Sequence, residues 1–259
     1  FTLVVLFFLY RVATEGRRLD SLLAGAFIGL GLATKVSLLP IYLAFITAHL
    51  AFATGFLESR TILWRPRWGL ALGGAVLGIG ASLGVFLLTQ PYALLDWSRF
   101  LSDLNEQSEM VRRIRDYPYT RQYIDTTPYW YHIRQLTVWG LGWPLGFAAW
   151  AGLGYVAFRG FRLSVGLVYL TLGVLLPAAL LLYSTNLVVL TVASLISVSV
   201  LIATGVLRSV ESRMGVLLLS WVVPYLLITG ALEVKFMRYM LPVTPLLILF
   251  GARFLVSIW

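Results

Sequence analysis

The sequence predicts an all-α protein, a polytopic bundle of transmembrane helices. Of its 259 residues, 59% are hydrophobic and only 12% are charged, whereas soluble domains are about half apolar and about a quarter charged. The apolar residues also gather in long runs, and a bilayer needs about 20 apolar residues for each helix that crosses it. These runs do not alternate apolar with polar residues, as the strands of a membrane barrel do.

Nine apolar runs are predicted to form the helical segments of a single transmembrane domain, residues 1–259. The runs cover roughly 1–13, 21–34, 36–54, 68–90, 136–158, 164–182, 187–207, 215–232 and 241–259. The second run is too short to span comfortably, so we expect a half-helix that breaks at Lys35 before the third run returns. Both ends of the sequence lie inside apolar runs, and we expect a chain truncated at both ends.

Small residues and prolines recur inside the runs. Glycines stand four positions apart at Gly25 and Gly29, Gly69 and Gly73, Gly74 and Gly78, Gly80 and Gly84, and Gly142 and Gly146. Such pairs let neighbouring helices approach closely, so we assign them to packing and not to binding. Kinks are expected at four prolines, namely Pro40, Pro144, Pro177 and Pro224.

Basic residues between the runs predict the orientation. Excess Lys and Arg mark the cytoplasmic side. One set of short connections holds Arg11, Arg17, Arg18, Arg60, Arg65, Arg67, Arg159, Arg162, Arg208 and Arg213, and the other holds Lys35, Lys235 and Arg238. The first set is therefore predicted to be cytoplasmic. Segment 91–135 carries six Arg and six Asp or Glu among many Tyr and Trp. We expect it to be a folded extracytoplasmic piece at the membrane interface.

Composition and motifs exclude several functions. The net charge of +9 would suggest nucleic acid in a soluble protein, but here the cations flank apolar runs, so we expect membrane lipid as the partner and no nucleic acid. The chain has no Cys, and its two His stand alone, so we predict no metal site on it. Walker, Rossmann and nucleophile-elbow motifs are absent from the sequence.

Three features of the predicted outer face could bind an anionic amphiphile. Lys35 ends an apolar half-helix, where a charge is costly unless it meets an anion or water. Segment 117–135 mixes aromatic rings with Arg121 and Arg134, which suit phosphate. Lys235-Phe-Met-Arg238-Tyr239 stands where the last run enters the membrane. Each could equally be an interfacial anchor, with aromatic rings and long cations at the headgroup level.

Several motifs, in this order, resemble a family of enzymes. They are Gly-Leu-Ala-Thr-Lys35, Gln90-Pro91-Tyr92, Pro118-Tyr-Thr-Arg-Gln-Tyr123, Thr127-Pro-Tyr129, Trp139-Gly-Leu-Gly142 and Phe236-Met-Arg-Tyr-Met-Leu-Pro242. Together they resemble the polytopic GT-C glycosyltransferases of family 39, which include protein mannosyltransferase-like and aminoarabinose-transferase-like enzymes. The resemblance extends from about residue 20 to about residue 250.

The resemblance implies an inverting membrane glycosyltransferase of a bacterial or archaeal plasma membrane. Its donor would be a polyprenyl-phosphate-linked sugar, and its acceptor a protein, lipid or glycan on the extracytoplasmic side. By the same resemblance, Lys35, Arg238 and Tyr239 would hold the donor phosphate, and the cavity above would be shaped by Arg121, Tyr123, Tyr129, Tyr131 and Arg134. The catalytic Asp would lie upstream of Phe1, so we expect this piece alone to be inactive. No cofactor is evident, and metal dependence stays open.

Two other functions remain open at this stage. A transporter or flippase of an amphiphilic lipid would also use a broken helix such as the one expected at Lys35. A non-catalytic membrane subunit of a larger complex would use the many small-residue faces to bind partner helices.

Overall fold

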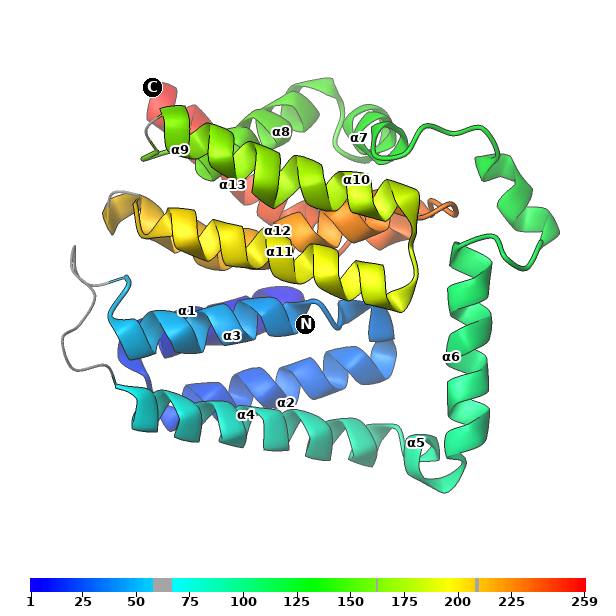
Figure 1. Ribbon diagram of the computed structural model, residues 1–259, viewed down its shortest axis with the longest axis horizontal. Coiled ribbons are helices and arrows are strands. Elements are labelled where there is room, and N and C mark those ends of the chain that lie inside the picture. Colours follow the sequence, from blue (N-terminus) through cyan, green and yellow to red (C-terminus); the bar gives the residue numbers. More distant parts are fainter. Residues whose placement is uncertain (58–66, 162, 208–209) are drawn as a thin grey trace. The chain divides into compact units, whose positions relative to one another are not determined.

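The computed structural model describes residues 1–57, 67–161, 163–207 and 210–259 (Figure 1). Within these ranges all regular structure is helical, which confirms the all-α prediction. Five helices are long and apolar enough to cross a membrane, namely Val36–Thr54, Trp68–Thr89, Leu163–Tyr183, Leu187–Gly205 and Ser212–Ala231. The chain is therefore a membrane protein by the length and composition of its helices, while nine membrane segments stay a prediction.

The chain divides into two compact units. The first contains Phe1–Trp97 and Ile202–Trp221, and the second contains Ser98–Leu201 and Val222–Trp259.

The first unit begins with four helices and a short fifth. They are α1 (Thr2–Glu15), α2 (Arg18–Thr34), α3 (Ile41–Thr54), α4 (Trp68–Thr89) and α5 (Tyr92–Leu95). The predicted break after the second run is confirmed, since α2 ends at Thr34 and Lys35 is extended with φ −159° and ψ 107°. A 3-10 turn, Val36–Leu38, then leads into α3. Helix α2 begins at Arg18, three residues before the predicted run, because its polar first turn is helical too.

Glycines bring α2 and α4 into backbone contact. A Cβ added to Gly25 would collide with the backbone of Gly78, and one added to Gly29 would collide with the carbonyl of Ser82. The two pairs Gly25/Gly29 and Gly74/Gly78 therefore pack helices as predicted. The prediction is wrong for Gly69, Gly80 and Gly84, because an added Cβ there would meet nothing within 4 Å.

The second unit holds the remaining elements, with α11 and α12 shared between the units. These elements are α6 (Trp97–Val111), a 3-10 turn (Pro118–Tyr123), α7 (Trp130–Gln135), α8 (Trp143–Phe158), α9 (Leu163–Val168), α10 (Leu176–Tyr183), α11 (Leu187–Gly205), α12 (Val210–Ala231), a second 3-10 turn (Met237–Met240) and α13 (Thr244–Ile258). Short π-helical segments follow α7 at Leu136–Gly140 and α9 at Tyr169–Leu175.

Close packing recurs in this unit between α8 and α13. A Cβ on Gly152 would collide with the backbone of Phe250, and one on Gly251 would press against Ala148 and Ala149. The predicted pair Gly142/Gly146 has another role: Gly142 precedes α8 with φ 75°, and Gly146 lies against Thr137 of the preceding turn.

The four prolines stand in different places. Pro40 precedes α3 and Pro144 lies in the first turn of α8, where a missing N–H breaks no helical bond. Pro177 is the second residue of α10, one residue after the π-helical segment Tyr169–Leu175, within the continuous helix Leu163–Tyr183. Pro224 lies inside α12.

Candidate functional site

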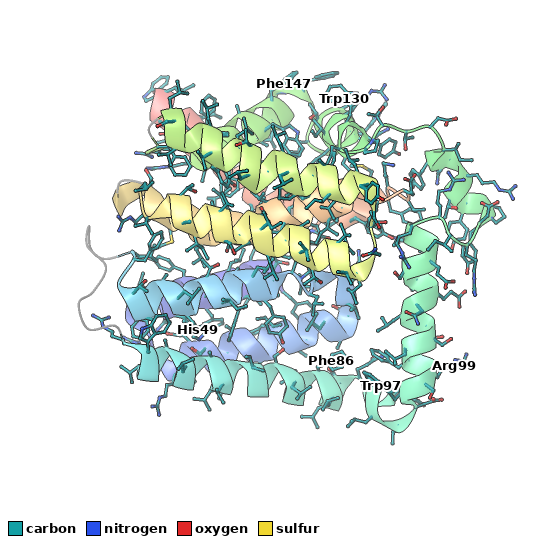
Figure 2. All side chains as sticks on the ribbon, in the orientation of Figure 1. His49, Phe86, Trp97, Arg99, Trp130 and Phe147 are labelled. Atoms are coloured by element: carbon teal, nitrogen blue, oxygen red, sulfur yellow. The ribbon has the colours of Figure 1, made fainter. Side chains whose placement is uncertain are left out.

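The candidate site lies at one end of the second unit. Helices α10 and α12 end there, and α8, α11 and α13 begin there (Figure 1). Exposed aromatic side chains mark this end, since Trp139 is 80% and Tyr183 is 90% exposed, and Trp130 (Figure 2) and Trp143 are exposed as well. Trp and Tyr prefer the level of the lipid headgroups, so this end is the one expected at a membrane–water boundary.

An array of aromatic rings forms around Phe236. Tyr119 stacks on Phe236 with ring centroids 6.3 Å apart, and Tyr123 meets it edge-on at 5.4 Å. Tyr131 meets Tyr123 at 5.7 Å, and Tyr239 meets Phe236 at 5.5 Å. We call these five residues the ring array. It includes three of the predicted site residues, namely Tyr123, Tyr131 and Tyr239.

Arg238 adds a positive charge to the ring array. Its Cζ lies 4.3 Å from the centroid of Phe236, a cation–π contact, and its guanidinium also hydrogen bonds with Tyr239. Burial raises the pKa of Tyr239, while the charge of Arg238 opposes that rise. The backbone carbonyl of Tyr239 accepts a 2.7 Å hydrogen bond from the buried Tyr225 hydroxyl, which fixes the turn to α12. The predicted neighbours Arg238 and Tyr239 therefore form one positioned pair.

Tyr129 fastens the 117–135 segment to the helices. Its N–H donates to the carbonyl of Gly230 at 2.9 Å, and its ring covers Gly230, where any Cβ would collide with it. Its hydroxyl donates to the carbonyl of Ala178 at 3.4 Å. With φ 59° and ψ −53°, and with the Trp130 N–H bonded back to the Pro128 carbonyl, Tyr129 sits in a classic γ-turn, which is rare and strained. Burial raises the pKa of Tyr129 to about 12, so it serves as a neutral anchor.

The other predicted cavity residues are exposed. Arg121 forms an ion pair with Asp116, with Nη2 and Oδ2 2.7 Å apart, and this bond lowers the pKa of Asp116. Arg134 is exposed on α7. Exposed pairs contribute little to stability, so the Arg121 pair leaves both groups accessible to a ligand.

Two buried basic side chains beside the ring array were not among the predicted site residues. Lys235 is 1% exposed and its Nζ donates to the carbonyl of Glu233 at 3.2 Å. His132 is 2% exposed, its ring meets Tyr131 edge-on, and neither ring nitrogen has a hydrogen-bond partner. Burial and then the charge of Lys235 lower the pKa of His132 to about 4. The one sequence signal for Lys235 was its place three residues before Arg238.

Lys35 belongs to the first unit, where its half-buried side chain follows the end of α2. The structure thus places the predicted phosphate ligands in two units, Lys35 in one and the pair Arg238 and Tyr239 in the other.

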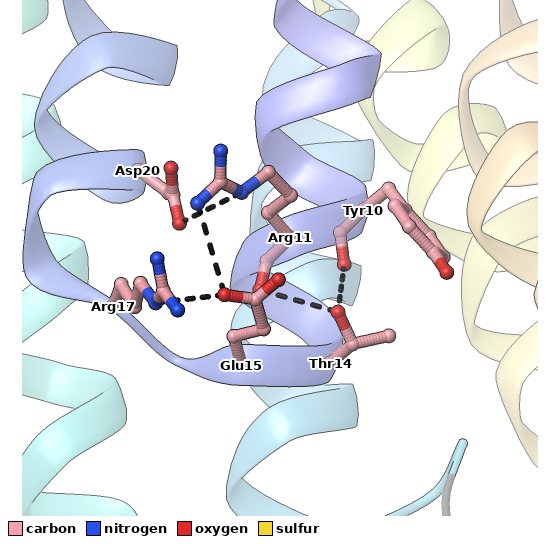
Figure 3. A network of polar contacts seen from close by, with 6 residues as sticks. All are labelled: Tyr10, Arg11, Thr14, Glu15, Arg17 and Asp20. Atoms are coloured by element: carbon pink, nitrogen blue, oxygen red, sulfur yellow. Dashed lines mark hydrogen bonds and ion pairs between the residues drawn. The ribbon is translucent and has the colours of Figure 1, made fainter.

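Several of the arginines predicted to be cytoplasmic have partners within the first unit. Arg11 lies 3.3 Å from the buried carboxylate of Asp20, and Arg17 lies 2.7 Å from Glu15 (Figure 3). Arg213 is 5% exposed and donates to the carbonyls of Phe56 and Val206, both at 2.9 Å. Four more of these arginines lie outside the described residues, namely Arg60, Arg65, Arg162 and Arg208.

His49 is also buried in this unit, where Ser21 Oγ lies 3.1 Å from its Nε2 and the Phe45 carbonyl lies 2.9 Å from its Nδ1. Over the described ranges no group of three His, Cys, Asp or Glu could hold a metal ion.

No family model, curated protein or solved structure matches the chain.

Proposed function

We propose that this chain is the carrier-binding part of a GT-C-type membrane glycosyltransferase, which moves a sugar from a polyprenyl-phosphate donor to an extracytoplasmic acceptor. The observation that carries the proposal is Arg238, held over Phe236 in the ring array at the end of α12 and the start of α13. A polyprenyl phosphate needs lipid for its tail and a cation at the lipid boundary for its head. The apolar helices and Arg238 supply that combination.

The residues divide the work as follows. Arg238 binds the donor phosphate as a charge-assisted fork, and the Tyr239 hydroxyl donates a hydrogen bond to the same phosphate. Lys35 is proposed as a phosphate ligand on the family resemblance alone. As the sugar leaves, charge develops on the carrier phosphate, and fixed cations in a poorly hydrated site stabilise that charge. Tyr131 offers an aromatic face to the sugar, and the buried Tyr123 supports the Tyr131 ring by an edge-on contact. Tyr129 anchors their segment, and Arg121 and Arg134 stand at its exposed side.

The remaining parts of the proposal follow the family resemblance. Nine helical segments would form the GT-C-like bundle in a bacterial or archaeal plasma membrane, with this end outside. The general base would be a carboxylate upstream of Phe1. The acceptor would be a protein, a lipid or a glycan.

The test is sugar transfer from a polyprenyl-phosphate donor by the full-length protein in proteoliposomes. We expect Arg238→Gln and Lys35→Met each to lower kcat/KM by roughly 10- to 100-fold, the value of one charge-assisted hydrogen bond. Arg99→Gln is the matched control, because Arg99 is an exposed arginine on α6 that lies 3.6 Å from Asp103. It should stay within about twofold of wild type.

Unchanged donor affinity and turnover in both Arg238→Gln and Lys35→Met would sink the proposal. Movement of the intact lipid across the bilayer, without sugar release, would favour a flippase. If neither sugar transfer nor lipid movement is observed, and other membrane proteins co-purify with the chain, a non-catalytic subunit would be favoured.

A further inference from the structure

Three segments of the second unit bring basic groups together beside the ring array. Arg113 follows α6, His132 lies in α7, and Lys235 follows α12. The N–H of Val234 donates to the carbonyl of Val111 at 3.1 Å, which ties the residue before Lys235 to the last turn before Arg113. Contacts of the Tyr123 ring with Tyr131 and Phe236 hold α7 close to the segment that contains Lys235. We call Arg113, His132 and Lys235 the basic cluster.

Several polar atoms of the basic cluster are buried and lack a full set of hydrogen-bond partners. Lys235 donates one of its three N–H groups to the Glu233 carbonyl. Both ring nitrogens of His132 and the Nε of Arg113 are buried without a hydrogen-bond partner. A buried donor left unsatisfied costs about 1–3 kcal/mol, and an uncompensated buried charge costs more. The unsatisfied donors of His132 and Arg113, close to the charged Lys235, indicate an acceptor that belongs among them.

The charges around the basic cluster are unbalanced. Glu233 attracts Lys235 and Asp116 attracts Arg113, and both of these carboxylate residues are exposed. Burial lowers the pKa of Lys235, and repulsion from the nearby Arg113 lowers it further. The backbone is strained here as well, since Arg113 has φ 54°, a left-handed conformation that non-glycine residues rarely adopt. Such strain clusters at ligand sites and switch regions.

We propose that Arg113, His132 and Lys235 form an anion site that binds a phosphate group. The phosphate oxygens accept hydrogen bonds from the Lys235 ammonium, the Arg113 Nε–H and the one N–H of neutral His132. Each bond to the two cations is charge-assisted, and the anion cancels the repulsion between them. This site does not include Arg238 and goes beyond the proposed transfer activity, because phosphate can bind here whether or not a sugar is moved. The phosphate comes from a lipid headgroup or from solution.

The chain offers a direct reporter of this site. It contains two histidines: His132 in the basic cluster, and His49 in the first unit, held by Ser21 and Phe45. In detergent, histidine-ring 15N NMR of the protein is followed while farnesyl phosphate, inorganic phosphate or farnesol is added, and His132→Gln assigns the signals. We expect farnesyl phosphate to shift His132 and to leave His49 unchanged, and farnesol to shift neither.

The arms separate the two sources of phosphate. A His132 shift with farnesyl phosphate alone supports a lipid headgroup, and an equal shift with inorganic phosphate supports free phosphate. The proposal is overturned if neither phosphate moves His132, or if farnesol moves it equally. Loss of sugar transfer in Arg238→Gln with an unmoved His132 signal would overturn this site and leave the proposed function standing.

A substitution gives a second measurement. Lys235→Met removes the buried charge at similar volume, and we expect it to raise the Kd for farnesyl phosphate at least roughly tenfold, the effect of about 1.4 kcal/mol. Arg99→Gln, which removes a positive charge outside the cluster, should stay within about twofold. Equal binding by Lys235→Met and wild type overturns the site. If Lys235→Met does not fold, the wild-type NMR titration still decides.

Discussion

At the scale of single residues, the described chain keeps its charges near lipid by pairing them. Asp20 is 2% exposed and lies beside Arg11, and Arg213 satisfies two backbone carbonyls. A count of basic residues between apolar runs identifies these arginines but not their partners. The partners are distant in sequence, since Asp20 lies more than two helical turns after Arg11 and Phe56 lies 157 residues before Arg213.

The ion pair of Arg11 with Asp20 gives the first prediction. Arg11→Met leaves a buried carboxylate without its cation, and breaking a fully buried pair costs about 3–5 kcal/mol. Because the Arg11 side chain is 29% exposed, we expect a smaller loss, about 2–3 kcal/mol in the free energy of unfolding in mixed micelles. Arg17→Gln, which breaks the exposed pair with Glu15 and leaves Arg11 in place, should cost below about 1 kcal/mol. Equal losses in both variants would contradict the pairing.

The buried His132 gives a pH dependence. Its pKa is about 4 in the folded protein, against 6.5 for an unburied histidine, because burial and Lys235 disfavour its charged form. Above pH 6.5 both folded and unfolded states are neutral at this ring. Between pH 6.5 and 4 only the unfolded state takes up the proton. The free energy of unfolding therefore decreases as the pH is lowered through this range, by roughly 3 kcal/mol in all. Unfolding measured across this range should show that slope in wild type, and His132→Gln should lose it.

At the scale of elements, apolar runs predicted where helices lie far better than what joins them. The end of α2 at Thr34 and the bounds of α4 follow from hydropathy, because a charge or a Gln–Pro pair ends each run. The segment after α6 carries no such signal. Its shape depends on distant partners: Val111 bonds to Val234, and Tyr129 bonds to Gly230.

The packing of α2 against α4 gives a prediction with a control in the same helix. Gly78 touches the Ser21 carbonyl and Phe45, whereas a Cβ on Gly80 meets nothing within 4 Å. Gly78→Ala should therefore destabilise the protein by about 1–3 kcal/mol, the usual cost of overpacking. Gly80→Ala should be neutral or stabilising by up to about 1 kcal/mol, because alanine favours helix. Thermal unfolding in detergent compares the two variants. If Gly80→Ala destabilised the protein more than Gly78→Ala, close packing of α2 against α4 at Gly78 would be excluded.

At the scale of the whole molecule, sequence order predicted a membrane bundle and one polar end but not the grouping of the site. Tyr123, Tyr131 and Tyr239 meet around Phe236, a residue that the sequence marked only as part of a motif. Arg121 turned out to be paired with Asp116. No periodicity reports such contacts, because they join loops whose geometry is set by helices far away in the sequence.

The orientation gives a prediction that the chain is well suited to test. It has no Cys, so single introduced cysteines label cleanly. Gln122 and Arg159 flank α8 on its two sides in the sequence, and Gln122 is predicted to face outward. In intact cells a membrane-impermeant maleimide should label Gln122→Cys, and should label Arg159→Cys only after permeabilisation. The reverse pattern would invert the topology and place the ring array in the cytoplasm.

The bond between Tyr129 and Gly230 also sets an order of assembly. The ribosome makes Tyr129 long before Gly230, and the translocon receives α8, α10 and α11 in between. Until α12 emerges, the γ-turn at Tyr129 has no carbonyl to bind and the ring of Tyr123 has no Phe236 to meet. The nascent protein therefore carries an unfinished 117–135 segment until α12 has been made. The segment closes only when α12 is inserted, so premature termination before residue 230 leaves every group of the basic cluster except Lys235 present but unassembled.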